Sequence, residues 1–176
     1  MTDPFDTLGV EPRYELDLAA VERRHRDLSR ALHPDRYTGA PAAERRLSLS
    51  RAIDVNEALR VLKDPVRRAE ALLRRRGTHL AETGEPRPSP ALLMEMMEVR
   101  EELADAGRAK DLARVHALAE GMRGRESAVR ARLASAFDAA AGGANELVEI
   151  LPLLGELRYI RRFLEEVSAI EDELAP

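Results

Sequence analysis

The chain has 176 residues and a net charge of −4, and its aromatic content of only 3% favours helices over strands, so we expect an all-α protein. It has no cysteine and no long apolar run, which excludes disulfides, thiolate metal sites and membrane spans and, without a hydrophobic leader, fits a cytoplasmic protein. Residues 1–88 carry 17 Lys and Arg against 15 Asp and Glu, too small an excess for the strongly basic surface of a nucleic-acid-binding protein.

The first elements predicted along the chain are a short helical turn, ending within residues 6–10, and a pair of longer helices. The first long helix ends before Pro34, and its apolar face repeats every three or four residues through Leu16, Leu18, Val21, His25, Leu28 and Leu32. The second runs from about Ala42 to Lys63 and ends at Asp64-Pro65, with an apolar stripe that includes Leu47, Ile53, Leu59 and Leu62. A loop rich in turn formers, residues 33–41, is long enough to let the two helices pack antiparallel.

A boundary between two helical units is predicted where one Gly and three Pro interrupt the helical pattern in residues 79–90. We therefore expect a first unit at 1–78, a linker at 79–89 and a C-terminal unit at 90–176. The C-terminal unit is predicted to be a three-helix bundle.

The three helices of this bundle are predicted from their caps and breaks. Ser89 and Pro90 suit a helix start and Gly107 its stop. The second helix extends from Lys110 to about Ala141, before Gly142-Gly143. The third follows a capping Asn145 and ends near Leu174, and its Pro152 and Gly155 should kink it or delay its start.

The loop between the two long N-terminal helices opens with His33-Pro34-Asp35. Pro34 fixes its own φ and biases His33 away from helical angles, so the loop starts in a restricted shape. An imidazole and a carboxylate on a rigid turn can make charge-assisted hydrogen bonds to a partner protein. The alternative is a simple helix stop, with Asp35 bonding nearby backbone amides.

The helix before this loop carries arginines that project away from its apolar stripe. They are Arg23, Arg24, Arg26 and Arg30, and Arg36 extends the positive surface past the loop. Such a face suits an acidic partner, whereas the alternative is a solvated charged surface.

The order of these features resembles a J domain. The tripeptide follows a basic amphipathic helix, opens a helix–helix loop and precedes a helix that ends with NEALRVLKDPVRRAE, residues 56–70. In that family the tripeptide and the basic helix engage the ATPase domain of a DnaK-class chaperone. By this resemblance the chaperone-binding residues are Arg23, Arg24, Arg26, Arg30, His33, Pro34, Asp35 and Arg36.

A narrower resemblance, to the HscB or Jac-type J proteins of iron-sulfur cluster assembly, covers nearly the whole chain. It is carried by FDTLGVEPRYELD at residues 5–17, RRAEALL at 67–73 and LLMEMMEVREEL at 92–103. The sequence departs from the family where Leu92 stands for an aromatic residue, Met97 for an aliphatic residue and Tyr159 for a phenylalanine. These departures bear on the edge of the client site.

In that family an apolar and acidic patch on the C-terminal bundle binds the iron-sulfur scaffold, an IscU-like protein. Carried over, the client-binding residues are Leu93, Met94, Met97, Glu98, Glu101, Asp105 and Tyr159. The positions on the first bundle helix lie three or four residues apart and share one face. The alternative is that Leu93, Met94 and Met97 belong to the bundle core, although unpaired carboxylates on the same stripe argue against burial.

Other classes of function are weighed against this interpretation. The four histidines, at 25, 33, 79 and 116, show no metal-ligand spacing, and no catalytic constellation is recognisable, so we expect no enzyme, no metal and no cofactor. His25 lies on an apolar stripe and should pack inside. A general J-domain co-chaperone for misfolded clients stays open as an alternative, with residues 92–103 as the discriminator.

Overall fold

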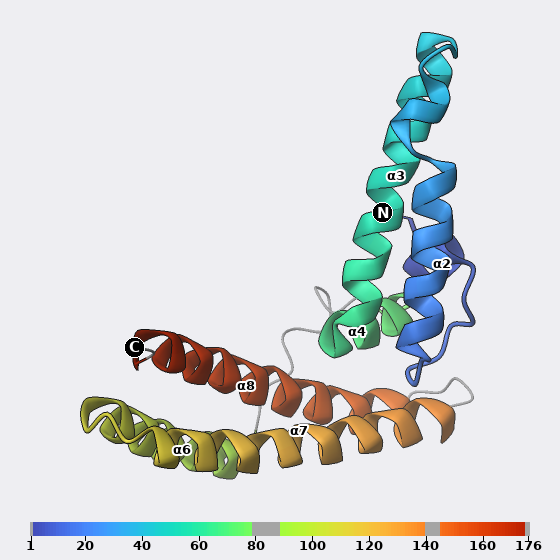
Figure 1. Ribbon diagram of the computed structural model, residues 1–176. Coiled ribbons are helices and arrows are strands. Elements are labelled where there is room, and N and C mark those ends of the chain that lie inside the picture. Colours follow the sequence, from blue (N-terminus) through green and yellow to red (C-terminus); the bar gives the residue numbers. More distant parts are fainter. Residues whose placement is uncertain (1, 79–88, 140–144, 175–176) are drawn as a thin grey trace. The chain divides into compact units, whose positions relative to one another are not determined.

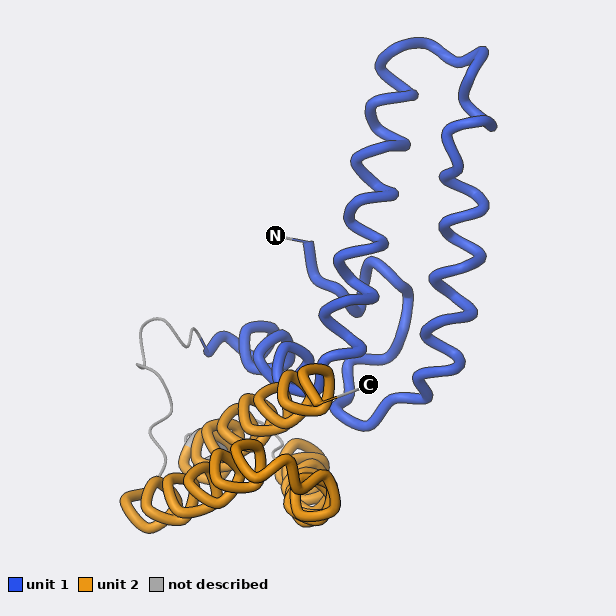
Figure 2. Tube along the Cα trace, turned by 60° about the vertical axis from the view of Figure 1, so that its left-hand side comes forward, with its two compact units in different colours: residues 1–83 blue, residues 84–176 orange. Residues whose placement is uncertain are grey.

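The computed structural model describes residues 2–78, 89–139 and 145–174, and within these ranges every regular element is a helix. The prediction of an all-α protein is therefore confirmed for the described part of the chain. The chain divides into two compact units, residues 1–83 and 84–176 (Figure 2). The predicted linker, residues 79–89, lies outside the described residues except for Ser89.

The N-terminal unit is an antiparallel helical hairpin with two short helices at its base. Its elements are α1 (Pro4–Leu8), α2 (Leu18–Ala31), the 3-10 helix η1 (Pro34–Tyr37), α3 (Ala42–Lys63) and α4 (Pro65–Arg75). Helices α2 and α3 run side by side, and the loop that joins them lies at the end of the hairpin remote from α1 and α4 (Figure 1). The core at the base is formed by Phe5, Leu8, Val21, Val55, Ala58, Leu62, Leu72 and Leu73.

The predicted short helical turn is α1, and its two ends explain why it forms. The Asp3 carboxylate accepts a hydrogen bond of 2.8 Å from the Phe5 amide at the start. Gly9 ends the helix in the left-handed region, with φ of 61°. The left-handed backbone angle favours glycine here, whereas the nearest atom to a Cβ at this position would be a guanidinium nitrogen of Arg24, at 2.8 Å, whose flexible side chain can move aside.

Helix α3 has the predicted bounds, but its predicted inward face is confirmed only in part, since Leu62 is buried and Leu59 half-buried. Leu47 and Ile53 are 52% and 60% exposed, and the buried positions are Ser48, Val55, Ala58 and Leu62. In the outer half of a two-helix hairpin only one neighbouring helix is present, so only a narrow side of α3 can be covered. The apolar residues of this half therefore lie partly in solvent.

Helix α4 follows α3 after a single residue, and the sequence interpretation missed it. Asp64 accepts hydrogen bonds from the amides of Val66 and Arg67, at 2.9 and 3.0 Å, and Pro65 occupies the first helical position. The pair Asp64-Pro65 thus ends one helix and also starts the next.

Arg68 of α4 is a buried arginine, only 1% exposed, in the core of the N-terminal unit. Its Nη1 donates a hydrogen bond of 2.9 Å to the carbonyl oxygen of Leu62, and its guanidinium carbon lies 5.0 Å from the centre of the Tyr14 ring. These contacts fasten α4 to the end of α3 and to the segment before α2.

The C-terminal unit is a three-helix bundle of α6 (Pro90–Arg108), α7 (Leu112–Ala139) and α8 (Asn145–Leu174), as predicted (Figure 1). Ser89 caps α6 by accepting a hydrogen bond of 3.2 Å from the Leu92 amide. Gly107 is not the stop, because α6 continues to Arg108 and the turn is made by Lys110, with φ of 55°. The predicted break at Gly142-Gly143 lies outside the described residues.

Helix α8 begins at Asn145, so this residue is its first helical residue and not its cap, and Pro152 does not delay the start. A proline inside a helix removes one backbone donor. Because Pro152 lies on the exposed side of α8, water can hydrate the carbonyl that loses its partner. The inward face of α8 is formed by Ile150, Leu153, Leu154, Leu157, Ile160, Phe163 and Val167.

Candidate functional site

The tripeptide His33-Pro34-Asp35 forms a sharp, exposed corner at the end of α2. His33 is extended, with φ of −61° and ψ of 133°, and precedes Pro34 at the first position of η1. The Asp35 amide donates a hydrogen bond of 3.3 Å to Nδ1 of His33, whose distance to the Asp35 carboxylate is 3.5 Å. Both side chains are largely exposed, at 59% and 85%. The corner therefore presents an imidazole and a carboxylate together to solvent.

Hydrogen bonds from the loop and from α3 fasten this corner. The hydroxyl of Ser48, a residue only 5% exposed, donates a hydrogen bond of 3.0 Å to the backbone carbonyl of Leu32. The Tyr37 hydroxyl donates a hydrogen bond of 3.4 Å to the backbone carbonyl of Ala31. The Thr38 hydroxyl donates one of 3.2 Å to the backbone carbonyl of Asp35. Sequence reasoning missed Ser48, because a serine within a helix gives no signal of a partner on another helix.

The predicted arginines of α2 divide between two sides of the helix. Arg23, Arg26 and Arg30 follow three- and four-residue spacing and share one exposed face. Arg24 lies off this row, with its guanidinium against Gly9. Arg36 is exposed on η1, just after the corner. The structure thus groups three of the four helix arginines and separates Arg24 from them.

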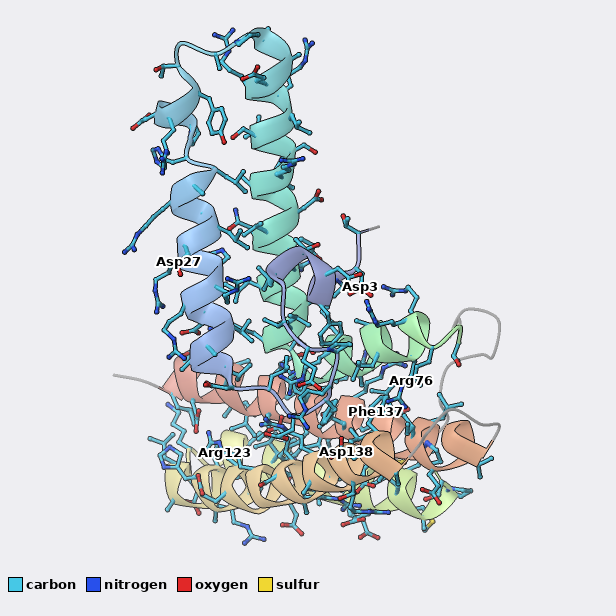
Figure 3. All side chains as sticks on the ribbon, turned by 90° about the vertical axis from the view of Figure 1, so that its right-hand side faces the viewer. Asp3, Asp27, Arg76, Arg123, Phe137 and Asp138 are labelled. Carbon is cyan, nitrogen blue, oxygen red and sulfur yellow. The ribbon has the colours of Figure 1, made fainter. Side chains whose placement is uncertain are left out.

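Two acidic residues form ion pairs with arginines of this face and so reduce its positive charge. Arg23 lies 3.7 Å from the carboxylate of Asp17, and Arg30 lies 3.8 Å from that of Asp27. Figure 3 labels Asp27 on α2 and shows side chains with nitrogen and oxygen atoms along the outside of the hairpin. All four side chains are well exposed, so such pairs are weak in water and can exchange for a partner's charges.

Polar contacts between α2 and α3 hold the hairpin in register. Nε2 of His25 lies 2.8 Å from Oδ1 of Asn56 in an exposed contact, and His25 is only half-buried, so the prediction that it packs inside is not confirmed. Nearer the base, Nζ of Lys63 lies 2.8 Å from the carboxylate of Glu22. The hydrogen bond from Lys63 and its positive charge lower the pKa of Glu22. The arginine face is therefore carried by a helix that is tied to its neighbour at several levels.

The second predicted site lies on the outward face of α6. Met94 and Met97 are 64% and 70% exposed, and Leu93, Glu98, Glu101 and Asp105 are also exposed. The core side of α6 is formed instead by Leu92, Met96, Leu103 and Ala106. The alternative that Met94 and Met97 are bundle core is therefore wrong. We call Leu93, Met94, Met97, Glu98 and Glu101 the α6 outward face.

The carboxylates along α6 differ in whether they already have partners. Asp105 is paired with Arg108 on the same helix. Two other carboxylates of α6 are paired with arginines of α7, Glu95 with Arg125 and Glu102 with Arg114. Glu98 and Glu101 have no ion pair within the described part of the chain. These two carboxylates are therefore the ones available to a cation on a partner, whereas Asp105 would first have to leave Arg108.

Tyr159 of α8 is the remaining predicted client residue. It is half-buried, so its ring is only partly accessible to a partner. It comes from a different helix from the other six predicted residues.

Ion pairs fix α6 against the other two helices of the bundle. Arg125 of α7 bridges Glu95 of α6 and Glu156 of α8, the latter at 2.7 Å. Partial burial by itself lowers the pKa of Arg125, but hydrogen bonds to Glu156 and Glu95 outweigh it and hold that pKa above its ordinary value. Arg100 of α6 also lies 2.9 Å from Glu166 of α8. The α6 outward face is thus presented by a firmly seated helix.

Within the ranges that the structure describes, no group of three or more His, Cys, Asp or Glu side chains is arranged to hold a metal ion. None of the described helices is long and apolar enough to span a membrane.

Comparison with known families assigns both parts of the chain. Residues 3–71 match the DnaJ domain, and residues 88–168 match the HSCB C-terminal oligomerisation domain. A Burkholderia multivorans protein named "Co-chaperone protein HscB homolog" is 34% identical over 166 residues, covering 94% of this chain and 91% of that relative. A Bordetella avium protein of the same name is 36% identical and covers 96% of this chain and 97% of its own length.

Solved structures with the same fold include two proteins named HscB. The chaperone HscB from Vibrio cholerae aligns with a TM-score of 0.84 at 28% identity, over 99% of this chain and 100% of that one. The human co-chaperone protein HscB aligns with a TM-score of 0.84 at 22% identity, over 97% of this chain and 83% of that one, a likeness of fold.

Proposed function

Since the chain belongs to the HscB family of J-domain co-chaperones, we propose that it stimulates ATP hydrolysis by a DnaK/HscA-class chaperone and delivers an IscU-like iron-sulfur scaffold protein to it. The single observation that carries this proposal is the exposed His33-Pro34-Asp35 corner on a chain whose second unit has a separate apolar and acidic face. In this proposal the protein is no enzyme itself, because the hydrolysis occurs on the chaperone.

The N-terminal unit supplies the contact with the chaperone. The corner at positions 33–35 offers one imidazole and one carboxylate to an arginine or backbone group. Beside the corner, the row of Arg23, Arg26 and Arg30 binds acidic side chains of the chaperone. Pro34 keeps the corner rigid, and Arg36 adds a positive charge beyond it. Arg24 belongs to the proposed set only as a longer-range charge, because its guanidinium lies against Gly9.

The C-terminal unit supplies the contact with the scaffold. Leu93, Met94 and Met97 give an apolar centre, and Glu98 and Glu101 offer negative charge to a basic rim on the partner. Flexible thioethers can adapt to the contours of another protein. Asp105 and Tyr159 form the proposed edges of the site, the first after exchange of its partner Arg108.

The two contacts are assigned to separate parts of the chain. The proposed bounds are 1–78 for the J domain, 79–89 for the linker and 90–176 for the scaffold-binding bundle. Two weak contacts on one chain act together, since binding through one unit raises the effective concentration of the other partner. We place this activity in the cytoplasm, where the chaperone has ATP. The family name of the second unit also allows self-association, and sedimentation of the purified chain over a concentration series measures it.

The proposal is tested by the steady-state ATPase rate of the chaperone, measured alone, with this protein, with the scaffold and with both. We expect a modest rise with this protein and a rise larger than additive when the scaffold is present. A rise that the scaffold does not increase, but that an unfolded model client does, would support a general J-domain co-chaperone instead. No rise in any mixture would contradict both functions.

A further inference from the structure

The methionines that the structure describes fall into two environments within the same bundle. Met96 and Met122 are buried in the core, at 1% and 7% exposure. Met94 and Met97 lie largely in solvent on the α6 outward face, at 64% and 70% exposure. One helix therefore carries a protected sulfur between two accessible ones.

Accessibility decides which thioether reacts with an oxidant in water. A buried sulfur reacts only after local opening of the bundle, whereas an exposed one reacts directly. The buried side chains of α6, which are Leu92, Met96, Leu103 and Ala106, oppose such opening. Met94 and Met97 lie on the exposed side of α6 and need no such opening to react.

We propose that Met94 and Met97 are a reversible oxidation site for hydroperoxides and that their oxidation disables the α6 outward face. The second half of this inference rests on the proposed function of that face.

The reaction is a two-electron oxygen transfer. A lone pair on the methionine sulfur attacks one peroxide oxygen, the O–O bond breaks and an S–O bond forms. The sulfur is oxidised by two electrons, and the departing hydroxide takes the proton of the transferred oxygen and leaves as water when the reagent is hydrogen peroxide. Reversal consumes two thiols, which become a disulfide while the sulfoxide oxygen leaves as water, with a methionine sulfoxide reductase as catalyst.

Oxidation changes the face in the property that the proposed contact uses. A thioether is apolar and adaptable, but a sulfoxide is polar and strongly hydrated. Two sulfoxides three residues apart would replace the apolar centre between Leu93 and Glu98 with groups that must be dehydrated on binding. Because both side chains point away from the core, the bundle itself keeps its fold.

The first experiment maps the modification on the whole chain without any partner. The protein is treated with a series of hydrogen peroxide concentrations, and peptides are quantified by mass spectrometry while circular dichroism follows the fold. We expect Met94 and Met97 to be oxidised roughly tenfold faster or more than Met96 and Met122, as expected for direct reaction against reaction through local opening. Equal rates for the two pairs would overturn the site.

The second experiment measures binding of an IscU-like scaffold by calorimetry before oxidation, after oxidation and after treatment with reductase. We expect binding to weaken about tenfold or more on oxidation and to recover on reduction. The control is the double variant Met94→Leu, Met97→Leu, which carries no sulfur on this face, so its affinity for the scaffold, whatever its starting value, should be the same before and after peroxide treatment.

The outcomes separate this inference from the proposed function. Unchanged binding by the oxidised protein, at full occupancy of both sulfoxides, would overturn the switch. Equal loss of binding by the leucine variant would also overturn it, because the loss would come from other residues. If the untreated protein does not bind the scaffold, the proposed function and the switch both fail, and the peptide map alone still decides the oxidation site.

Discussion

The hydroxyl of Ser48 donates a hydrogen bond of 3.0 Å to the backbone carbonyl of Leu32, across the two helices of the N-terminal hairpin. Leu32 directly precedes His33, so this bond fixes the point from which the exposed corner projects. Ser48 is nearly buried and itself contacts no partner protein in our proposal. It is therefore a positioning residue for the His33-Pro34-Asp35 corner.

Replacing Ser48 by Ala should loosen the corner. The Leu32 carbonyl loses its donor in a nearly buried place, which costs about 1–2 kcal/mol. We expect faster amide hydrogen exchange in residues 33–40 and a several-fold lower maximal stimulation of the chaperone ATPase, with helix content unchanged. Ser50→Ala on the exposed side of the same helix is the matched control, and equal exchange in both variants would contradict this role.

Replacing Asp35 by Asn should abolish stimulation of the chaperone without unfolding the chain. The side chain is 85% exposed, so its charge contributes little to stability, and a change in unfolding free energy within about 0.5 kcal/mol is expected. Asparagine keeps the size but loses the negative charge that a partner cation would meet. ATPase rates and a urea melt measure the two effects, and retained stimulation would refute the assignment of Asp35.

The separation of Arg24 from the other helix arginines gives a matched pair of variants. Arg26→Gln should weaken the apparent affinity for the chaperone several-fold and reduce its salt dependence, because Arg26 stands in the row with Arg23 and Arg30. Arg24→Gln should change affinity less, since its guanidinium lies against Gly9. Titrations of ATPase stimulation at two salt concentrations compare them, and a larger effect at Arg24 would exclude the row as the contact.

Substituting Met97 and Glu98 together by Ala should abolish scaffold binding and leave stimulation by the J domain intact. Both side chains are exposed and make no core contact, so the bundle should melt as the unmodified chain does. Arg132→Ala, an exposed change on α7, is the control. Calorimetric titration with the scaffold measures the effect, and an unchanged dissociation constant would rule out the α6 outward face.

Arg68 should prove a stability residue. Arg68→Met keeps the apolar stem but removes the donor to the Leu62 carbonyl and the cation over Tyr14, so we expect a loss of about 2 kcal/mol in unfolding free energy. Arg67→Met, on the exposed side of the same turn, should change it by less than about 0.5 kcal/mol. Urea unfolding followed by circular dichroism compares them, and equal midpoints would disprove the role.

Much of the fold follows from local signals in the sequence. Ser89 and Pro90 predict the start of α6 because an oxygen acceptor and a residue without an amide proton suit the first turn of a helix. Gly9 likewise ends α1. The pair Asp64-Pro65 carries the same start signal for α4 and also the stop signal of α3, and one dipeptide with both meanings hides the start of α4.

The parts that could not be predicted depend on distant partners. Which apolar residues of α3 are covered depends on where α2 ends, so exposed Leu47 and Ile53 looked like core. The roles of Ser48 and Arg68 depend on backbone carbonyls, those of Leu32 and Leu62, whose positions only the folded chain defines. For the candidate site, motif and spacing predict an exposed corner and a shared face of α6, but they do not predict that Asp105 already holds Arg108.

Helix α6 divides its side chains cleanly between Leu92, Met96, Leu103 and Ala106 inside and Met94, Met97, Glu98 and Glu101 outside. None of these eight residues stands in both sets, so substitutions at these outer positions should leave the core of the bundle intact. The same independence makes the helix a practical scaffold for selection. A library randomised at those four outer positions should yield mostly folded proteins, from which binders of new clients could be isolated.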